Sequence, residues 1–129
     1  MASKTTYKVI FRVKKAYYEQ IVAGTKTTEF RADSPYWHKA LVSLNKFFER
    51  VFGWKDWLHT QTIAPWTAEV KGVQAVFICA KGQKHVREVK AIGQQATPAD
   101  VREIVGTPRC FTFYLGAEIK NEAAQNADV

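Results

Sequence analysis

The fold is decided by residues 7–31, which begin with Tyr7-Lys8-Val9-Ile10-Phe11-Arg12-Val13 and end with Gly24-Thr25-Lys26-Thr27-Thr28-Glu29-Phe30-Arg31. The first run alternates and is rich in β-branched and aromatic residues, which predicts a strand. Residues 16–23 place Tyr17, Gln20 and Ile21 at helical spacing, and Gly24 is a natural helix stop because glycine adopts the left-handed conformation of a C-terminal cap. The segment therefore predicts a strand, a short helix and a second strand over residues 27–31.

The rest of the sequence predicts three more strands and two more helices. Residues 36–52 place apolar side chains at spacings of three and four, which is typical of an amphipathic helix. Strands are expected at 73–80, 85–92 and 110–119, and a short helix at 98–105 is expected to start from the capping residue Thr97. No periodic pattern covers residues 54–67. Strands and sparse helices that do not alternate strictly predict an α+β fold with a curled or closed sheet.

Composition predicts one globular domain over residues 1–129. Hydrophobic residues make up 47% and charged residues 24% of the chain, and the polar stretch 120–129 is expected to be a flexible tail. No run approaches the ~18 apolar residues that a membrane span needs, and lysines interrupt the N-terminal region where a signal peptide would be apolar. A cytoplasmic protein without a membrane partner is expected.

The cysteines and histidines predict neither a metal site nor a cofactor. Cys79 and Cys110 lie in apolar, strand-like runs and are expected to be buried, reduced thiols. The chain has no Cys-x-x-Cys, and its three histidines are scattered.

The net charge of +7 is concentrated at one end of the chain. Residues 1–31 contain seven basic and two acidic side chains, so the other 98 residues contribute only +2. Concentrated positive charge attracts phosphate backbones. The sequence therefore favours a nucleic acid as the partner, bound in a cleft where Lys26 and Arg31 are joined by some of Lys8, Arg12, Lys14 and Lys15.

The segment around Gly24 combines residue types that suit a binding cleft. Gly24 lets the backbone turn sharply and lets a ligand approach closely. Lys26 can meet a phosphate or a polarised carbonyl, and Arg31 offers a planar fork. Glu29 can hold either cation or accept a hydrogen bond from a nucleobase amino group. Tyr17 or Tyr18 can stack on a base, although one of them has to be buried in the core.

The same segment resembles the signature of the ASCH domain, a member of the PUA-like superfamily. In that family a helix bearing an aromatic residue ends in Gly-x-Lys-Thr and leads into a strand with Glu-x-Arg. The matching residues are Tyr18, Ile21, Gly24, Lys26, Thr27, Glu29 and Arg31. The resemblance implies a small mixed β-barrel of five to six strands with two to three flanking helices, and an RNA or nucleotide ligand bound by Tyr18, Gly24, Lys26, Thr27, Glu29 and Arg31.

Two other functions stay open at this point. Some ASCH members cut RNA and others hydrolyse acylated cytidine, which would make Lys26 and Glu29 catalytic residues of a small hydrolase. Glu29, however, stands where the amidohydrolase members have a threonine nucleophile, and the remote acid could be Glu69, Glu88 or Glu103. The third function is a protein-interaction module, because residues 34–67 form an aromatic-rich insert that contains all four tryptophans.

Overall fold

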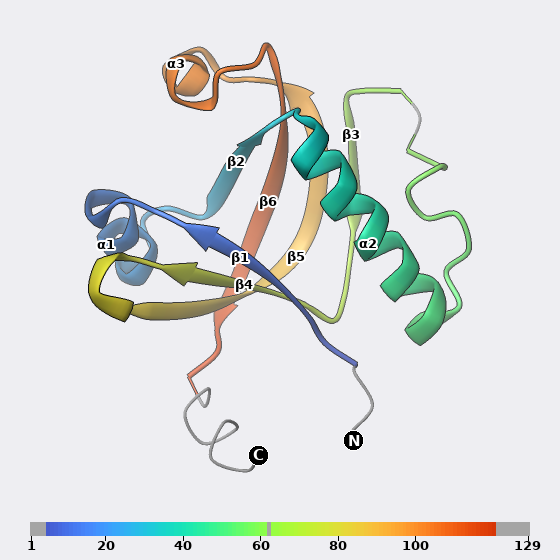
Figure 1. Cartoon of the computed structure of the whole chain (residues 1–129), viewed down its shortest axis with the longest axis horizontal. Helices are drawn as coiled ribbons and strands as arrows, with labels where there is room; N and C mark the ends of the chain where they lie inside the picture. Colours follow the sequence, from blue (N-terminus) through green and yellow to red (C-terminus); the bar gives the residue numbers. More distant parts are fainter. Residues whose placement is uncertain (1–4, 62, 121–129) are drawn as a thin grey trace.

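The structure, a computed structural model, describes residues 5–61 and 63–120. Residues 121–129 of the predicted tail lie outside the described residues. The described part contains a six-stranded sheet, three α-helices and two short 3-10 turns (Figure 1). In chain order the main elements are β1 (Tyr7–Arg12), α1 (Lys15–Ala23), β2 (Thr28–Ala32), α2 (Pro35–Phe52), β3 (Trp66–Glu69), β4 (Val73–Ile78), β5 (Lys84–Ala96), α3 (Arg102–Val105) and β6 (Arg109–Glu118).

The sheet is curled, with strand order β1-β4-β5-β6-β2 and β3 paired to β5. β1 and β4 run parallel, and the other pairs are antiparallel. Figure 1 shows the curl bringing the two outer strands, β1 and β2, to the same side of the molecule, where α1 connects them. The α+β half-barrel agrees with the fold predicted from the sequence.

The predicted helix boundaries have clear local causes. Gly24 ends α1 with φ of 83°, and Gly53 ends α2 with φ of 73°, both in the left-handed region that favours glycine. At the start of α2 the Ser34 hydroxyl accepts a hydrogen bond from the Trp37 amide at 3.4 Å, and Pro35 occupies the first turn.

The structure differs from the sequence-based prediction in three respects. β3 was not predicted, and β5 extends to Ala96 instead of ending near residue 92, because β3 and β6 pair with its second half. Thr97 does not cap the following helix: its hydroxyl donates to the Thr107 carbonyl oxygen at 2.7 Å, and a 3-10 turn at Ala99–Val101 precedes α3. The Thr97 bond closes the base of the lobe that contains α3.

α2 supplies much of the core. Its buried side chains Trp37, Leu41, Leu44, Phe47 and Phe48 face the curled sheet, and Phe11 of β1 stacks on Trp37 with ring centroids 5.5 Å apart. Phe48 is fully buried, and its ring lies 4.8 Å from that of Trp57. Trp37 and Trp57 are buried, and Trp54 and Trp66 pack against the same core. The aromatic-rich segment is therefore largely part of the core.

Cys79 and Cys110 are buried free thiols, as the sequence predicts. Among the described residues, no helix is long and apolar enough to cross a membrane.

We predict that Phe48→Ala lowers the free energy of unfolding by about 3–5 kcal/mol, because it leaves a cavity between α2 and the loop that contains Trp57. Chemical denaturation measures the change. Tyr36→Ala, on the exposed face of the same helix, is the control and should shift stability by less than about 0.5 kcal/mol. A loss below about 1 kcal/mol for Phe48→Ala would contradict this packing.

His85 is a buried titratable group away from the charged segment. Its Nδ1 lies 3.6 Å from Glu118 Oε2, and its Nε2 has no hydrogen-bond partner in the described part of the chain. Burial lowers the pKa of His85 below its usual 6.5; Glu118 opposes this shift and Arg87 adds to it. The folded protein therefore favours neutral His85.

A pKa that is lower in the folded state contributes stability above the unfolded pKa of about 6.5, and the contribution is lost as the pH falls through the folded value. We therefore predict that the free energy of unfolding decreases as the pH is lowered below about 6.5. His85→Gln should remove part of this dependence on pH. Denaturation curves at several pH values test it. The exposed His59, changed to Gln, is the matched control and should leave the slope unchanged.

Candidate functional site

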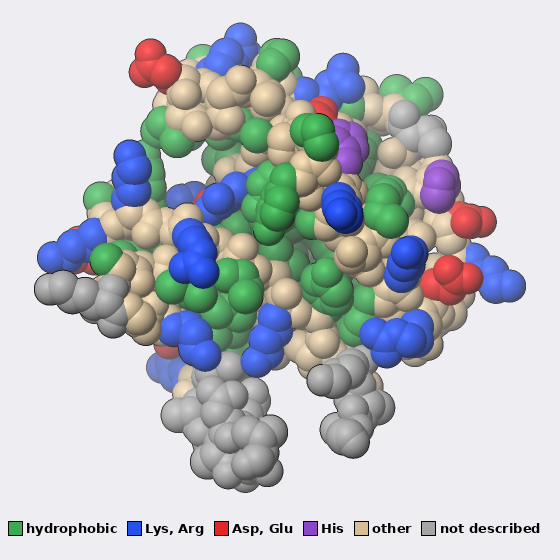
Figure 2. Space-filling view, viewed as in Figure 1, with side chains coloured by type: hydrophobic (Ala, Val, Ile, Leu, Met, Phe, Trp, Pro, Cys, Tyr) green, Lys and Arg blue, Asp and Glu red, His purple; other side chains and the backbone are tan. Residues whose placement is uncertain are grey.

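A cavity of about 650 Å³ lies beside β2 and is called here the β2 pocket. In Figure 2 the surface is hollowed between the lobe that contains α3 and the part that contains α1. The volume is within the usual range of small-molecule sites. Its borders come from four parts of the chain: Arg12, Val13, Lys14, Tyr17, Gln20, residues 25–32, Trp37, Asp100, Val101, Ile104 and Val105.

Glu29 is the central charged residue of the β2 pocket and is only 6% exposed. Its Oε2 accepts a hydrogen bond from Arg31 Nε at 2.9 Å, and Arg31 Nη2 lies 2.8 Å from the same atom. Lys26 Nζ lies 3.2 Å from Oε1 but donates its hydrogen bond to the Thr28 carbonyl oxygen. Oε1 accepts no hydrogen bond from any described residue. A ligand that donates an N–H or O–H could satisfy this buried acceptor.

Arg31 is fixed on the other side by aromatic rings. Its guanidinium carbon lies 5.1 Å from the Phe11 ring centroid and 5.8 Å from that of Trp37. Its Nη2 also donates to the Arg12 carbonyl oxygen at 3.2 Å. Because the guanidinium contacts rings, a carboxylate and a backbone carbonyl at once, its orientation is set before any ligand arrives.

The charges around the β2 pocket are mostly positive. Arg12 and Lys14 border it together with Lys26 and Arg31, as predicted, whereas Lys8 and Lys15 do not. Its opposite wall is formed by the α3 lobe, where apolar Val101, Ile104 and Val105 accompany Asp100. The pocket thus combines a cationic side with an apolar side, which suits an anionic ligand with a flat, apolar body.

The structure brings most of the predicted site residues together. Lys26, Thr27, Glu29 and Arg31 border the β2 pocket, and Gly24 forms the helix end that leads into it. Both Thr27 and Thr28 border it, although strand alternation predicts that only one would. β2 begins at Thr28, so Thr27 lies just before the strand, where alternation does not strictly apply.

The two tyrosines of α1 have different surroundings. Tyr17 borders the β2 pocket, whereas Tyr18 packs against the core with its ring edge-on to His85 at 6.5 Å. Burial raises the pKa of the Tyr18 phenol, and Cys79 raises it further. The structure therefore places Tyr18 outside the pocket.

None of the acids proposed to complete a catalytic set borders the β2 pocket. Glu69, Glu88 and Glu103 are absent from its border, and the acid found there with Glu29 is Asp100. Asp100 was not predicted as a site residue, because no local signal indicates that the α3 lobe folds over β2.

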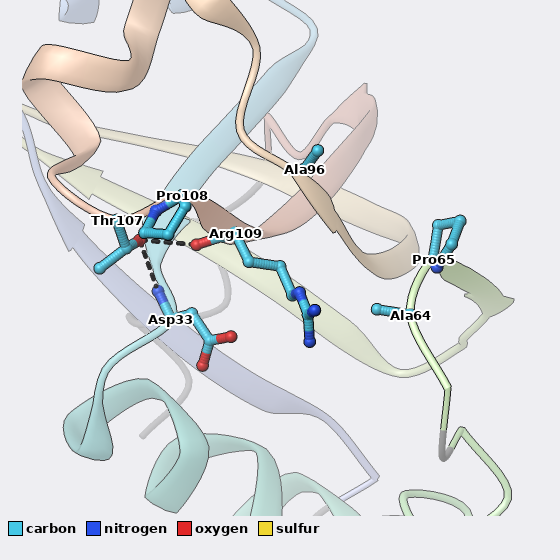
Figure 3. A pocket seen from close by; sticks show the side chains of 7 residues that line it. All are labelled: Asp33, Ala64, Pro65, Ala96, Thr107, Pro108 and Arg109. Carbon is cyan, nitrogen blue, oxygen red and sulfur yellow. Dashed lines mark hydrogen bonds between the residues drawn. The ribbon is translucent and has the colours of Figure 1, made fainter.

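A second cavity of about 600 Å³ lies beyond the end of β2 (Figure 3). The Asp33 carboxylate at its edge contacts His38 Nε2 and accepts a hydrogen bond from Gln94 Nε2 at 3.0 Å. The Asp33 amide donates to Thr107 Oγ1, and Gln94 Oε1 accepts from Trp66 Nε1. Figure 3 shows the Arg109 side chain between Asp33 and Ala64. Because these bonds connect β2, β3, β5 and the α3 lobe, the network has a structural role.

Within residues 5–61 and 63–120, no group of three or more histidine, cysteine, aspartate or glutamate side chains could hold a metal ion. Searches of known protein families, curated proteins and solved structures find no match to this chain. The chemistry of the β2 pocket is therefore inferred from its own geometry.

We predict that Arg31→Met lowers the free energy of unfolding by about 3 kcal/mol, because Glu29 stays buried with one cation fewer. Adding Glu29→Gln in the same chain should recover part of the loss, so that the two changes are non-additive by more than about 1 kcal/mol. Urea denaturation of the single and double variants measures the coupling. Arg109→Met is the control, since Arg109 is exposed. Additive effects of the two changes would show that Glu29 and Arg31 are not energetically coupled.

Proposed function

We propose that this chain is an ASCH-type domain that binds a nucleotide or single-stranded RNA in the β2 pocket. The observation that carries the proposal is the Glu29 carboxylate, which is buried between Lys26 and Arg31 and has one oxygen, Oε1, without a hydrogen bond in the described residues. Phosphate alone would not fit this position, because a second anion next to a buried carboxylate is repelled. A neutral ring with an N–H donor fits it.

The geometry supports a division of the ligand between two parts of the pocket. A nucleobase edge would donate to Glu29 Oε1 and accept from Lys26, while the apolar residues of the α3 lobe cover the ring. The phosphate group would lie with Arg12 and Lys14 at the end of β1, since both are exposed cations that border the pocket. Arg31 then acts as a positioning residue that holds Glu29 in place.

A small hydrolase is the second candidate function. The observation that favours it is the distance of 3.2 Å between Lys26 Nζ and Glu29 Oε1, since an amine beside a carboxylate is a feasible acid–base pair. Cleavage of RNA phosphodiesters would need only such a pair, whereas amide hydrolysis through an acyl-enzyme needs a nucleophile, and Glu29 replaces the family's threonine. A protein-interaction function through the tryptophans has less support, because all four contribute to the core.

We predict that Lys26→Ala weakens binding of a mixed pool of short single-stranded RNAs by about tenfold, and that Lys26→Arg restores most of it, because arginine keeps the charge. Fluorescence anisotropy at fixed salt measures both, with Lys15→Ala as the control, since Lys15 lies on α1 but does not border the pocket.

The same two variants distinguish binding from hydrolysis when the RNA is analysed for cleavage with and without EDTA. If Lys26 acts as an acid or base, arginine fails because it does not titrate in the working range. If the original chain cleaves RNA and Lys26→Arg does not, the chain is a hydrolase and the proposed binding function is wrong. Unchanged affinity in Lys26→Ala would place any RNA site elsewhere.

A further inference from the structure

A shallow groove of about 210 Å³ lies between β1 and α2 and is called here the β1–α2 groove. Lys8 and Ile10 border it from β1, and Tyr36 and Ala40 border it from α2. Trp37 borders both this groove and the β2 pocket. β1 also extends along both cavities, since Lys8 borders the groove and Arg12 borders the pocket. The two cavities are therefore neighbours along one strand.

Cations lie in a row on the outer face of α2. Lys39, Lys46 and Arg50 are exposed and spaced by seven and four residues, which places them on one stripe of the helix. At 1.5 Å per residue the stripe is roughly 16 Å long. Figure 2 shows Lys and Arg side chains gathered over both β1 and α2, with hydrophobic side chains between the two rows.

Two of the apolar residues between these rows are unusually exposed. Tyr36 is 69% and Ile10 is 52% exposed, and both border the β1–α2 groove. The Tyr36 ring is held edge-on against Trp37, with centroids 5.1 Å apart. An ordered aromatic face beside a row of cations is the combination that single-stranded nucleic acids use, since bases stack while phosphates contact lysine and arginine.

We propose that the β1–α2 groove is a second subsite for single-stranded RNA, which binds the part of the strand that flanks the nucleotide in the β2 pocket. Phosphates would contact Lys39, Lys46 and Arg50, and a base would stack on Tyr36. This proposal rests on the proposed function, because continuity with an occupied β2 pocket is what aligns the strand with the groove.

The orientation of α2 argues against a membrane surface as the partner that binds at the β1–α2 groove. A helix that lies in a bilayer interface inserts an apolar face, but the apolar stripe of α2, which includes Leu41, Leu44 and Phe48, is buried in the core. The face that α2 presents outward carries three cations, Lys39, Lys46 and Arg50, and one acid, Glu49. An anionic strand with stacking bases matches the charges and the groove together.

The test compares two RNA pools of random sequence. The longer pool, about twelve nucleotides, is within the usual length of a single-strand site, and the shorter pool, about three nucleotides, is below it. The double variant Lys39→Glu, Lys46→Glu should weaken binding of the longer pool at least about tenfold. The slope of log affinity against log salt should decrease by about 0.7 for each lost phosphate contact. Binding of the shorter pool should change less than about twofold. Fluorescence anisotropy at several salt concentrations gives all three values.

The matched control is Lys84→Glu with Lys90→Glu, an equal change in net charge at exposed positions of β5 that border neither cavity. It should weaken binding of the longer pool far less than the α2 variant does. Equal losses in the two double variants would overturn the subsite, since net charge alone would then explain them. Binding to vesicles containing anionic phospholipid that depends on Lys39 and Lys46, without binding of either RNA pool, would also overturn it.

Tyr36 gives an independent measurement on a residue without charge. Tyr36→Ala should weaken binding of the longer pool about tenfold, whereas Tyr36→Phe, which keeps the ring, should bind within about twofold of the original chain. Equal affinities for all three would overturn the stacking role. If Lys26→Ala leaves the shorter pool unaffected while the α2 variants still weaken the longer one, the proposed function of the β2 pocket fails and the groove alone binds RNA.

Discussion

The arrangement of the sheet edges and of the candidate site depends on the contacts of the Arg31 guanidinium. It lies over the Phe11 and Trp37 rings, pairs with the buried Glu29 carboxylate and donates to the Arg12 carbonyl oxygen. The last bond joins β2 to the end of β1, the two strands that the sheet itself leaves unpaired with each other. A single side chain thus links the core, the edge of the half-barrel and the charged centre of the pocket.

This linkage explains how a carboxylate can be buried beside a cavity. An isolated buried charge is strongly destabilising, but Glu29 has two cations within ion-pair distance. Lysine would not replace Arg31 equally well, because only a planar guanidinium can lie on the rings and bond to two acceptors at once. The core therefore determines the position of Arg31, and Arg31 determines that of Glu29. Oε1 is left buried without a hydrogen bond from the described residues.

The features that could be predicted from sequence are those with local causes. Gly24, Gly53 and the apolar stripe of α2 act within one or two helical turns, so α1 and α2 were predicted closely. β3 could not be predicted because a segment of four residues is too short to show a strand pattern of its own. It forms a strand because it pairs with β5. In the site, Lys26, Glu29 and Arg31 follow from one short motif. The choice between Tyr17 and Tyr18, and the approach of Asp100, depend on contacts with residues far along the chain.

Trp37 connects the two cavities in a way that constrains both. Its indole contacts Phe11 and Phe113 in the core, lies under the Arg31 guanidinium and supports the exposed Tyr36 ring. Because cores are close-packed, a shift of the Trp37 ring would be transmitted to Arg31 on one side and to Tyr36 on the other. A strand bound across both cavities would therefore contact side chains that are held by the same ring. The aromatic segment acts from within the core, by fixing the residues of the two cavities relative to one another.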